Sequence, residues 1–303
     1  MESYEIMCDF EQFLLQVAGV KETTKHQYLG YVQTFLLERF NHVSEHELSK
    51  LTPIDIIQFI MNQKKHYRVP YLKAMTTALR CFFRFLAMKG LCDERLVDAV
   101  PAVAAWKLSH IPKYITKEQL EILLSSFNRK RADGLRGDAI AICLSRLGLR
   151  RSEVAHLSLD NIKWRSGVVR ICDGKDRQAN ELPLPKDVGE AIVAYLRSGR
   201  PKTTERRIFV RHRRPMGVAL NGSAIGAIIR RGFKRTGLKV PSCGPHILRH
   251  TVATHMIQQG VSIKEIADIL RHKSIDTTVI YTKVDIPMLC EVALPWPDSG
   301  SVL

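Results

Sequence analysis

The sequence lacks several features that would assign it to a specialised class. It has no apolar run of about 18 residues, so a membrane-spanning helix is not expected. Its acidic N-terminus, residues 1–5, has no apolar signal segment, which favours a cytoplasmic protein. The seven cysteines are scattered without a Cys-x-x-Cys pair, so neither a disulfide framework nor a zinc site is expected. What remains is a globular protein whose 303 residues are enough for two ordinary domains.

Acidic residues are scarce in the second part of the chain. Residues 1–105 contain 12 Lys/Arg and 12 Asp/Glu, whereas residues 106–303 contain 34 and 18, so the whole net charge of +16 lies in the second part. Such an excess predicts a polyanionic partner, and nucleic acid is the usual one. A ribosomal or membrane-surface partner would fit the composition equally well.

The first hundred residues have the apolar periodicity of helices and predict a bundle of four or five. The pattern is strongest at residues 70–89, which Gly90 ends. Thr52 followed by Pro53 predicts another helix start, and Thr23 or Thr24 is expected to cap an earlier helix. We expect a helical domain at 1–105, a linker at 106–113, a second domain at 114–285 and a C-terminal tail at 286–303.

The second domain mixes helices with a few strands. Residues 167–171 predict a short strand, Asp173-Gly174 a turn, and residues 177–184 the returning strand of a hairpin. Helices are expected near residues 116–126, 135–147, 186–197, 223–236, 245–259 and 262–270. The predicted fold class is therefore mainly α with a small antiparallel β-sheet.

Two segments at the start of this domain contain basic residues at turns. In Gly148-Leu149-Arg150-Arg151-Ser152-Glu153, Arg150 stands at the turn into a helix, and Glu153 can reach back to its guanidinium. Lys175 follows Gly174 at the tip of the predicted hairpin. Each residue alone is more often a solvated surface group than a functional one.

Two later segments contain histidines, an arginine and a tyrosine. Pro245 begins a helix on which His246 and Arg249 lie three residues apart, hence on one face. His246 and His250 are also spaced like metal ligands, but no carboxylate accompanies them. We therefore expect no metal and interpret His250 as a hydrogen-bonded core residue.

The last segment runs from Leu270 to Tyr281. A capping box, Ser262-x-x-Glu265, opens the preceding helix, His272 ends it, and a second short helix delivers Tyr281 nine residues later. A tyrosine on its own at this position would be interpreted as an ordinary core or surface residue.

Taken together, these segments resemble the tyrosine recombinase (phage integrase) family, in particular its Xer-like members. The shared motifs are Gly-Leu-Arg-x-Ser-Glu, the hairpin Gly-Lys followed by Leu-Pro-Leu, His-x-Leu-Arg-His-Thr, and the step of nine from His to Tyr. The resemblance covers about residues 113–285, and the N-terminal helices are similar in kind to the core-binding domain of the family.

The resemblance implies a role for each residue of the signature. Arg150 and Arg249 would grip the non-bridging oxygens of a phosphodiester, and His272 would add a hydrogen bond. Tyr281 would be the nucleophile and form a 3′-phosphotyrosine. The resulting bond conserves the energy of the cleaved one, so neither ATP nor a metal ion, nor any other cofactor, is implied.

Proton transfers complete the implied mechanism. A phenol is mostly protonated at neutral pH, so the nucleophile needs an acceptor, and His246 fits that role. Lys175 fits the role of general acid for the departing 5′-hydroxyl.

Three functions fit these residues. A site-specific recombinase would act on double-stranded DNA sites as a homotetramer, or in an assembly with related recombinases. A type IB topoisomerase would use similar chemistry on one duplex, and a non-catalytic DNA-binding protein could retain the scaffold. The last is disfavoured because every signature position is occupied. The apolar residues of the tail predict docking on a neighbouring subunit, with folding back on its own domain as the alternative.

Overall fold

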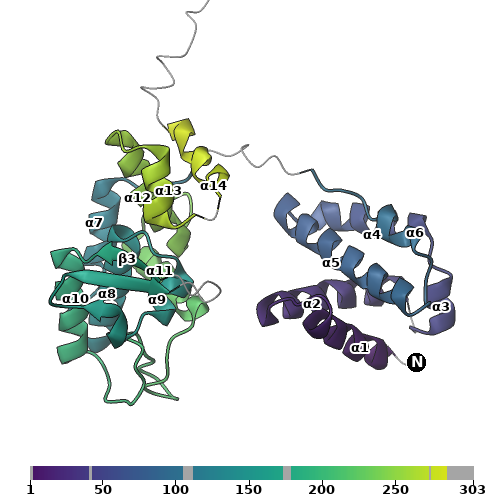
Figure 1. Cartoon of the computed structure of the whole chain (residues 1–303), viewed down its shortest axis with the longest axis horizontal. Helices are drawn as coiled ribbons and strands as arrows, with labels where there is room; N and C mark the ends of the chain where they lie inside the picture. Colours follow the sequence, from purple (N-terminus) through teal and green to yellow (C-terminus); the bar gives the residue numbers. More distant parts are fainter. Residues whose placement is uncertain (1–2, 41–42, 105–111, 173–178, 273, 285–303) are drawn as a thin grey trace, which may run out of the picture. The chain divides into compact units, whose positions relative to one another are not determined.

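The computed structural model describes residues 3–40, 43–104, 112–172, 179–272 and 274–284. The chain divides into two compact units, residues 1–107 and 108–303, called unit 1 and unit 2 below (Figure 1). The predicted fold class is confirmed, because the described residues are mostly helical with one small antiparallel sheet. Most of the predicted linker, and the whole predicted tail, lie outside the described residues.

In its described part, unit 1 consists of helices. They are α1 (Ser3–Gln16), α2 (Glu22–Arg39), α3 (Glu45–Ser49), α4 (Pro53–His66), α5 (Val69–Met88) and α6 (Arg95–Ala99).

Local sequence explains where these helices begin and what they bury. Thr52 forms a capping box with Asp55 at the start of α4, as the Thr-Pro pair predicted. The expected cap at Thr23 or Thr24 is wrong. Helix α2 begins earlier, at Glu22, and its N-cap is Lys21. Along α5, apolar residues at helical spacing form one buried face, which packs on α2 in an aromatic-rich core.

Unit 2 is built from helices around one short sheet. The helices are α7 (Lys117–Ser125), α8 (Ala132–Arg146), α9 (Arg151–His156), α10 (Lys186–Ser198), α11 (Gly222–Thr236), α12 (Pro245–Gln258), α13 (Ile263–Leu270) and α14 (Asp276–Val279), with the 3-10 helices η1 (Leu159–Asn161) and η2 (Ile280–Val284). All helices that the sequence predicted in this unit are present, to within a few residues at their ends.

The sheet is the predicted hairpin with one additional strand. β2 (Val168–Cys172) and β3 (Ala179–Pro183) pair antiparallel, with Val169 opposite Leu182. β1 (Ile162–Lys163) adds to the other edge of β2. A strand of two residues has no detectable alternation, which is why the sequence did not predict it.

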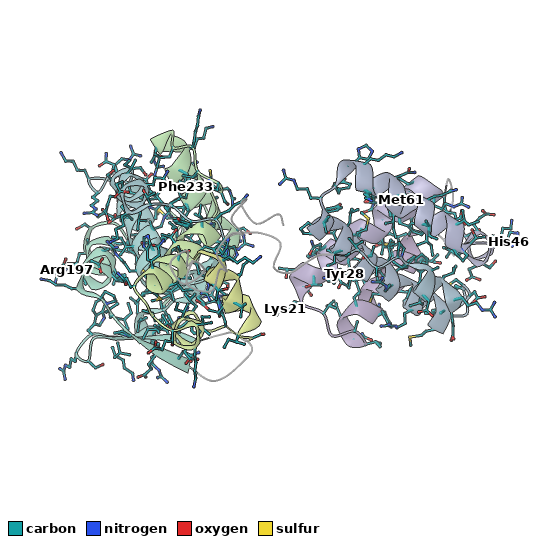
Figure 2. The ribbon with its side chains drawn as sticks, turned by 90° about the horizontal axis from the view of Figure 1, so that it is seen from above. Lys21, Tyr28, His46, Met61, Arg197 and Phe233 are labelled. Carbon is teal, nitrogen blue, oxygen red and sulfur yellow. The ribbon has the colours of Figure 1, made fainter. Side chains whose placement is uncertain are left out.

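The core of unit 2 surrounds α8, which is buried along most of its length and packs on α10, α12 and α11. Phe233 of α11 belongs to this core, whereas Arg197 at the end of α10 projects outward (Figure 2). The chain leaves α8 through Gly148, whose φ of +58° and close approach to Leu270 leave no room for a Cβ. This turn brings the end of α8 against α13.

Candidate active site

Arg150 is held at the start of α9, directly after the Gly148 turn. Its Nη1 donates to Oε1 of Glu153 at 2.7 Å, as the sequence predicted, and its Nη2 donates to the carbonyl of Arg271 at 2.8 Å. The backbone N–H of Arg150 also donates to Glu153, which caps α9. The guanidinium is therefore tied to two segments more than a hundred residues apart in the sequence.

Arg249 lies on α12 and is buried. Its guanidinium donates to the carbonyl of Gly148 at 2.5 Å and to the carbonyl of Leu270. Burial first, and the nearby Arg150 second, lower its pKa to about 10, so the group stays charged at neutral pH. Because Arg249 and Arg150 donate to the consecutive carbonyls of Leu270 and Arg271, their guanidinium groups lie close together.

A buried acid supports this pair. Glu153 accepts from Arg150 on one oxygen and from Arg271 Nη2 at 2.8 Å on the other. Burial alone would raise the pKa of Glu153, but the charge of Arg271 and the hydrogen bonds from Arg150 and Arg271 outweigh it and hold that pKa below its ordinary value. No role for Arg271 is predicted from the sequence, in which its only signal is its place beside His272.

His272 lies just after α13, and its imidazole is directed toward α14. Its Nδ1 lies 2.6 Å from the buried hydroxyl of Thr278. Burial, and then the charges of Arg249 and Arg150, lower its pKa to about 4. The imidazole is therefore neutral at pH 7 and can serve as a hydrogen-bond donor or acceptor.

Tyr281 lies on η2 with only 2% of its surface exposed. Its ring packs in a small apolar cluster with α12 and α13, and stacks parallel to His272 at 6.5 Å between ring centroids. Its hydroxyl lies 2.7 Å from Nδ1 of His250. Burial raises the pKa of Tyr281 to about 12, although Arg249 partly opposes this effect. In this state the tyrosine is a neutral phenol.

His246 is exposed on α12, one turn before His250, with 6.5 Å between the two ring centroids. Partial desolvation, followed by the charges of Arg151, Arg249 and Arg150, lowers its pKa. Among the described residues, the histidine that is hydrogen-bonded to the Tyr281 hydroxyl is His250 and not His246. The sequence interpretation of His250 as a hydrogen-bonded residue therefore missed the identity of its partner.

Four elements of unit 2 thus contribute to one site. Figure 1 shows α12, α13 and α14 grouped at one end of the unit, and these helices contact one another and η2. Together with the start of α9, they bring these predicted residues close to one another: Arg150, His246, Arg249, His272 and Tyr281. Lys175 lies outside the described residues, so its place in the site stays a prediction.

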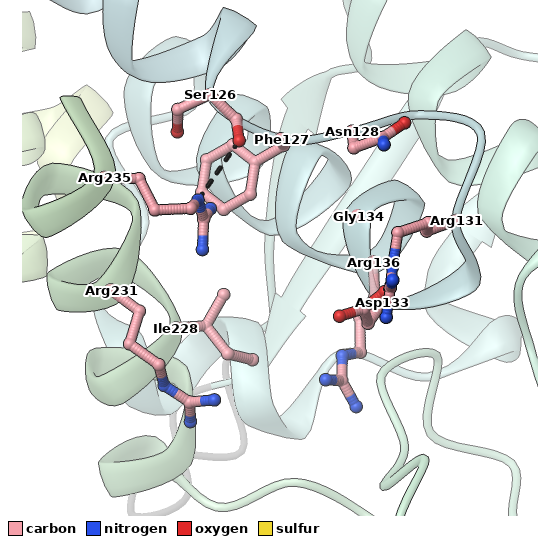
Figure 3. A pocket seen from close by; sticks show the side chains of 10 residues that line it. All are labelled: Ser126, Phe127, Asn128, Arg131, Asp133, Gly134, Arg136, Ile228, Arg231 and Arg235. Carbon is pink, nitrogen blue, oxygen red and sulfur yellow. Dashed lines mark hydrogen bonds and ion pairs between the residues drawn. The ribbon is translucent and has the colours of Figure 1, made fainter.

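A basic pocket of about 180 Å³ lies at the end of α8 away from Gly148 (Figure 3). Its arginines are largely engaged within the chain. Arg136 donates to the carbonyl of Val210 at 2.8 Å, and Arg235 donates to the carbonyl of Ser126 at 3.2 Å. Since α8 has 15 residues, this pocket lies about 20 Å from the Gly148 turn. It is therefore separate from the candidate active site.

Among the described residues, no group of three or more His, Cys, Asp or Glu side chains is arranged to hold a metal ion. No helix of the described part is long and apolar enough to span a membrane.

Residues 113–286, more than half of the chain, match the phage integrase family. The chain belongs to this family and is a tyrosine recombinase, a DNA strand-transferring enzyme. It is 40% identical over 288 residues to the integrase/recombinase y4rA of Sinorhizobium fredii, covering 95% of this chain and 70% of that protein. It is 30% identical over 289 residues to the tyrosine recombinase XerA of Thermococcus kodakarensis, covering 95% and 94%.

Solved structures share the fold. A lambda integrase dimer bound to a COC′ core site aligns with a TM-score of 0.71 at 16% identity, covering 93% of this chain and 77% of that one. The XerH recombinase bound to its difH substrate aligns with a TM-score of 0.68 at 17% identity, covering 94% and 84%.

Proposed function

We propose that this recombinase cleaves and rejoins DNA at specific sites through a covalent 3′-phosphotyrosine bond to Tyr281. The observation that carries the proposal is the pair of guanidinium groups, Arg150 and Arg249, held on consecutive carbonyls near a buried tyrosine. The repulsion between two positive charges this close together is offset when an anion binds between them. A DNA backbone supplies that anion as the scissile phosphate.

The arginines have the geometry for charge stabilisation. Negative charge develops on the non-bridging oxygens during an in-line displacement, and two guanidinium groups can donate to both of them. His272, neutral and beside both arginines, would contribute a further hydrogen bond. Removing one such preorganised donor typically lowers the rate by about 10²–10³-fold.

The chemical step exchanges one phosphoester for another. The Tyr281 hydroxyl oxygen forms a bond to phosphorus, the bond from phosphorus to the 5′-oxygen breaks, and the phenol proton leaves. We assign His246 as the acceptor of that proton and Lys175 as the donor of a proton to the departing 5′-oxygen.

The partner in this proposal is a double-stranded DNA recombination site. It is supported by the family membership and by structural relatives solved on their own DNA sites, including the lambda integrase dimer on a core site. We further propose a tetramer, formed by this chain alone or with related recombinases, on two duplexes. The cytoplasmic location expected from the sequence is part of the same proposal, as is the core-binding role of unit 1.

The nucleophile can be tested directly with Tyr281→Phe. A duplex nicked close to the cleavage site traps the covalent intermediate, because the short fragment diffuses away. We expect the wild type to form a protein–DNA adduct and Tyr281→Phe to form none while binding the same DNA with equal affinity. An undiminished adduct in the variant would contradict the assignment of Tyr281.

Two DNA substrates distinguish a recombinase from a type IB topoisomerase. A recombinase exchanges strands between two target sites, whereas a type IB topoisomerase relaxes a supercoiled plasmid that lacks them. We expect exchange between sites and no relaxation of the plasmid without sites.

A further inference from the structure

The hydroxyl of Tyr281 contacts a residue for which the chemistry proposed above has no role. His250 follows Arg249 on α12, and its Nδ1 lies 2.7 Å from the Tyr281 hydroxyl oxygen. The two ring centroids are 5.6 Å apart with a tilt of 55°, so the contact is made edge to hydroxyl and not by stacking. His250 is half-buried, and Tyr281 is almost fully buried.

The direction of this hydrogen bond follows from the surroundings of both groups. Burial raises the pKa of Tyr281 to about 12. Burial, and then the neighbouring His246 and Arg249, lower the pKa of His250 to about 4. At neutral pH the phenol therefore keeps its proton and the imidazole is uncharged, so the hydroxyl donates and Nδ1 accepts. The imidazole proton is then on Nε2.

We propose that His250 is a positioning residue for the nucleophile, fixing the Tyr281 hydroxyl to the helix that carries Arg249. This inference rests on the proposed role of Tyr281. The hydroxyl is tied to α12 through His250, and Arg249, the preceding residue, is tied to the carbonyls of Gly148 and Leu270. The separation between the attacking oxygen and the phosphate-binding guanidinium is thereby set by two adjacent residues.

The hydrogen bond to His250 matters because Tyr281 lies on a short helix of low intrinsic stability. η2 has five residues and the preceding α14 has four, and helices this short have little stability of their own. The apolar cluster holds the tyrosine ring, but apolar contacts are non-directional. The hydrogen bond to His250 adds the directional restraint on the hydroxyl that such packing does not provide.

Three substitutions of His250 separate positioning from packing and from proton transfer. In His250→Asn, the side-chain amide oxygen takes the place of Nδ1 and still accepts from the phenol. In His250→Gln, the same chemical group is displaced toward the place of Nε2, which makes it a matched control. His250→Leu introduces an apolar side chain of similar size and removes the hydrogen-bond acceptor.

The readout is the single-turnover rate of adduct formation on the nicked duplex, with DNA affinity and melting temperature measured in parallel. We expect His250→Leu and His250→Gln to slow adduct formation by about 10²-fold, the effect of a misplacement of about 1 Å. His250→Asn should recover most of the wild-type rate. DNA affinity should be unchanged in all three variants, since His250 does not contact the phosphate in this proposal.

Two results would overturn the inference. Wild-type rates in His250→Leu would show that the hydrogen bond has no role in the reaction. Equal and low rates in the Asn, Gln and Leu variants, with wild-type DNA affinity and melting temperature, would show that the imidazole itself transfers the proton. Absence of any adduct from the wild-type protein is a different outcome, because it contradicts the proposed function and not the role of His250.

Discussion

Arg271 has a backbone conformation that is unusual for arginine. Its φ of +55° lies in the left-handed region, which costs a residue with a Cβ about 1–2 kcal/mol. The side chain pairs with Glu153 at 2.8 Å, where both side chains are at most 4% exposed. Breaking a buried pair by removing one partner destabilises a protein by about 3–5 kcal/mol. Removing the Arg271 side chain would therefore cost more free energy than its backbone strain, which explains why an arginine is tolerated there.

This balance predicts different outcomes for two replacements of Arg271. Arg271→Gly and Arg271→Ala both remove the ion pair, but only glycine also removes the left-handed strain. We expect both variants to be less stable than the wild type, with alanine less stable than glycine by about 1–2 kcal/mol. Urea denaturation followed by circular dichroism measures both free energies of unfolding.

The pH dependence of the free energy of unfolding provides a control for this comparison. The pKa of Glu153 is lowered in the folded protein, so its contribution to stability is present above about pH 4.5, its ordinary pKa, and is lost as the pH falls through the lowered value. The gap between the wild type and Arg271→Gly should therefore narrow below pH 4.5. Equal stability of the glycine and alanine variants, or a gap that is independent of pH, would contradict the account.

The β2–β3 hairpin is the element expected to deliver the general acid. Cys172 and Ala179 form the last pair of the ladder, and the six residues between them include Lys175. α9, which begins directly after Arg150, contacts β2. The role of Lys175 itself stays a prediction from the sequence.

Replacing the leaving oxygen tests that role. We expect Lys175→Met to slow adduct formation on ordinary DNA, because the departing 5′-oxygen then lacks a proton donor. A substrate with sulfur at the 5′-bridging position should restore the rate, since a thiol has a pKa of about 8.5 and leaves without protonation. An equal defect on both substrates would show that Lys175 binds DNA instead of donating a proton.

At the scale of elements, the sequence predicted what local patterns encode. The helices of unit 2, the capping box at Ser262 and the reach of Glu153 to Arg150 follow from residues a few positions apart. It could not predict the contact of His250 with Tyr281 or that of Glu153 with Arg271, which join residues 31 and 118 positions apart. The family motifs supplied the candidate residues, but the hydrogen bonds among them depend on how α12 and α13 pack.

Across the whole molecule, fewer basic side chains are available to bind DNA than the number of Lys and Arg residues indicates. The loop of residues 197–214 contains eight Lys/Arg and one acid, which resembles a phosphate-binding edge. Two of its arginines are engaged internally, since Arg200 donates to the carbonyls of Ile208 and Arg207, and Arg206 pairs with Asp160. These two side chains hold the chain in place, so fewer than eight basic groups of the loop remain to contact phosphates directly.

The candidate site is assembled within one chain, which predicts how subunits share the reaction. Tyr281 is hydrogen-bonded to the helix that carries Arg249, and Arg150 is bound to the backbone of the same unit. Each subunit should therefore cut DNA with its own tyrosine. Mixing Arg150→Gln with Tyr281→Phe supplies an intact arginine on one chain and an intact tyrosine on the other, and we expect the mixture to form no adduct. Each variant mixed with wild type provides the control for assembly on DNA. An adduct on the Arg150→Gln chain would mean that the tyrosine reaches a neighbouring site, so that the buried position of Tyr281 is left on binding DNA.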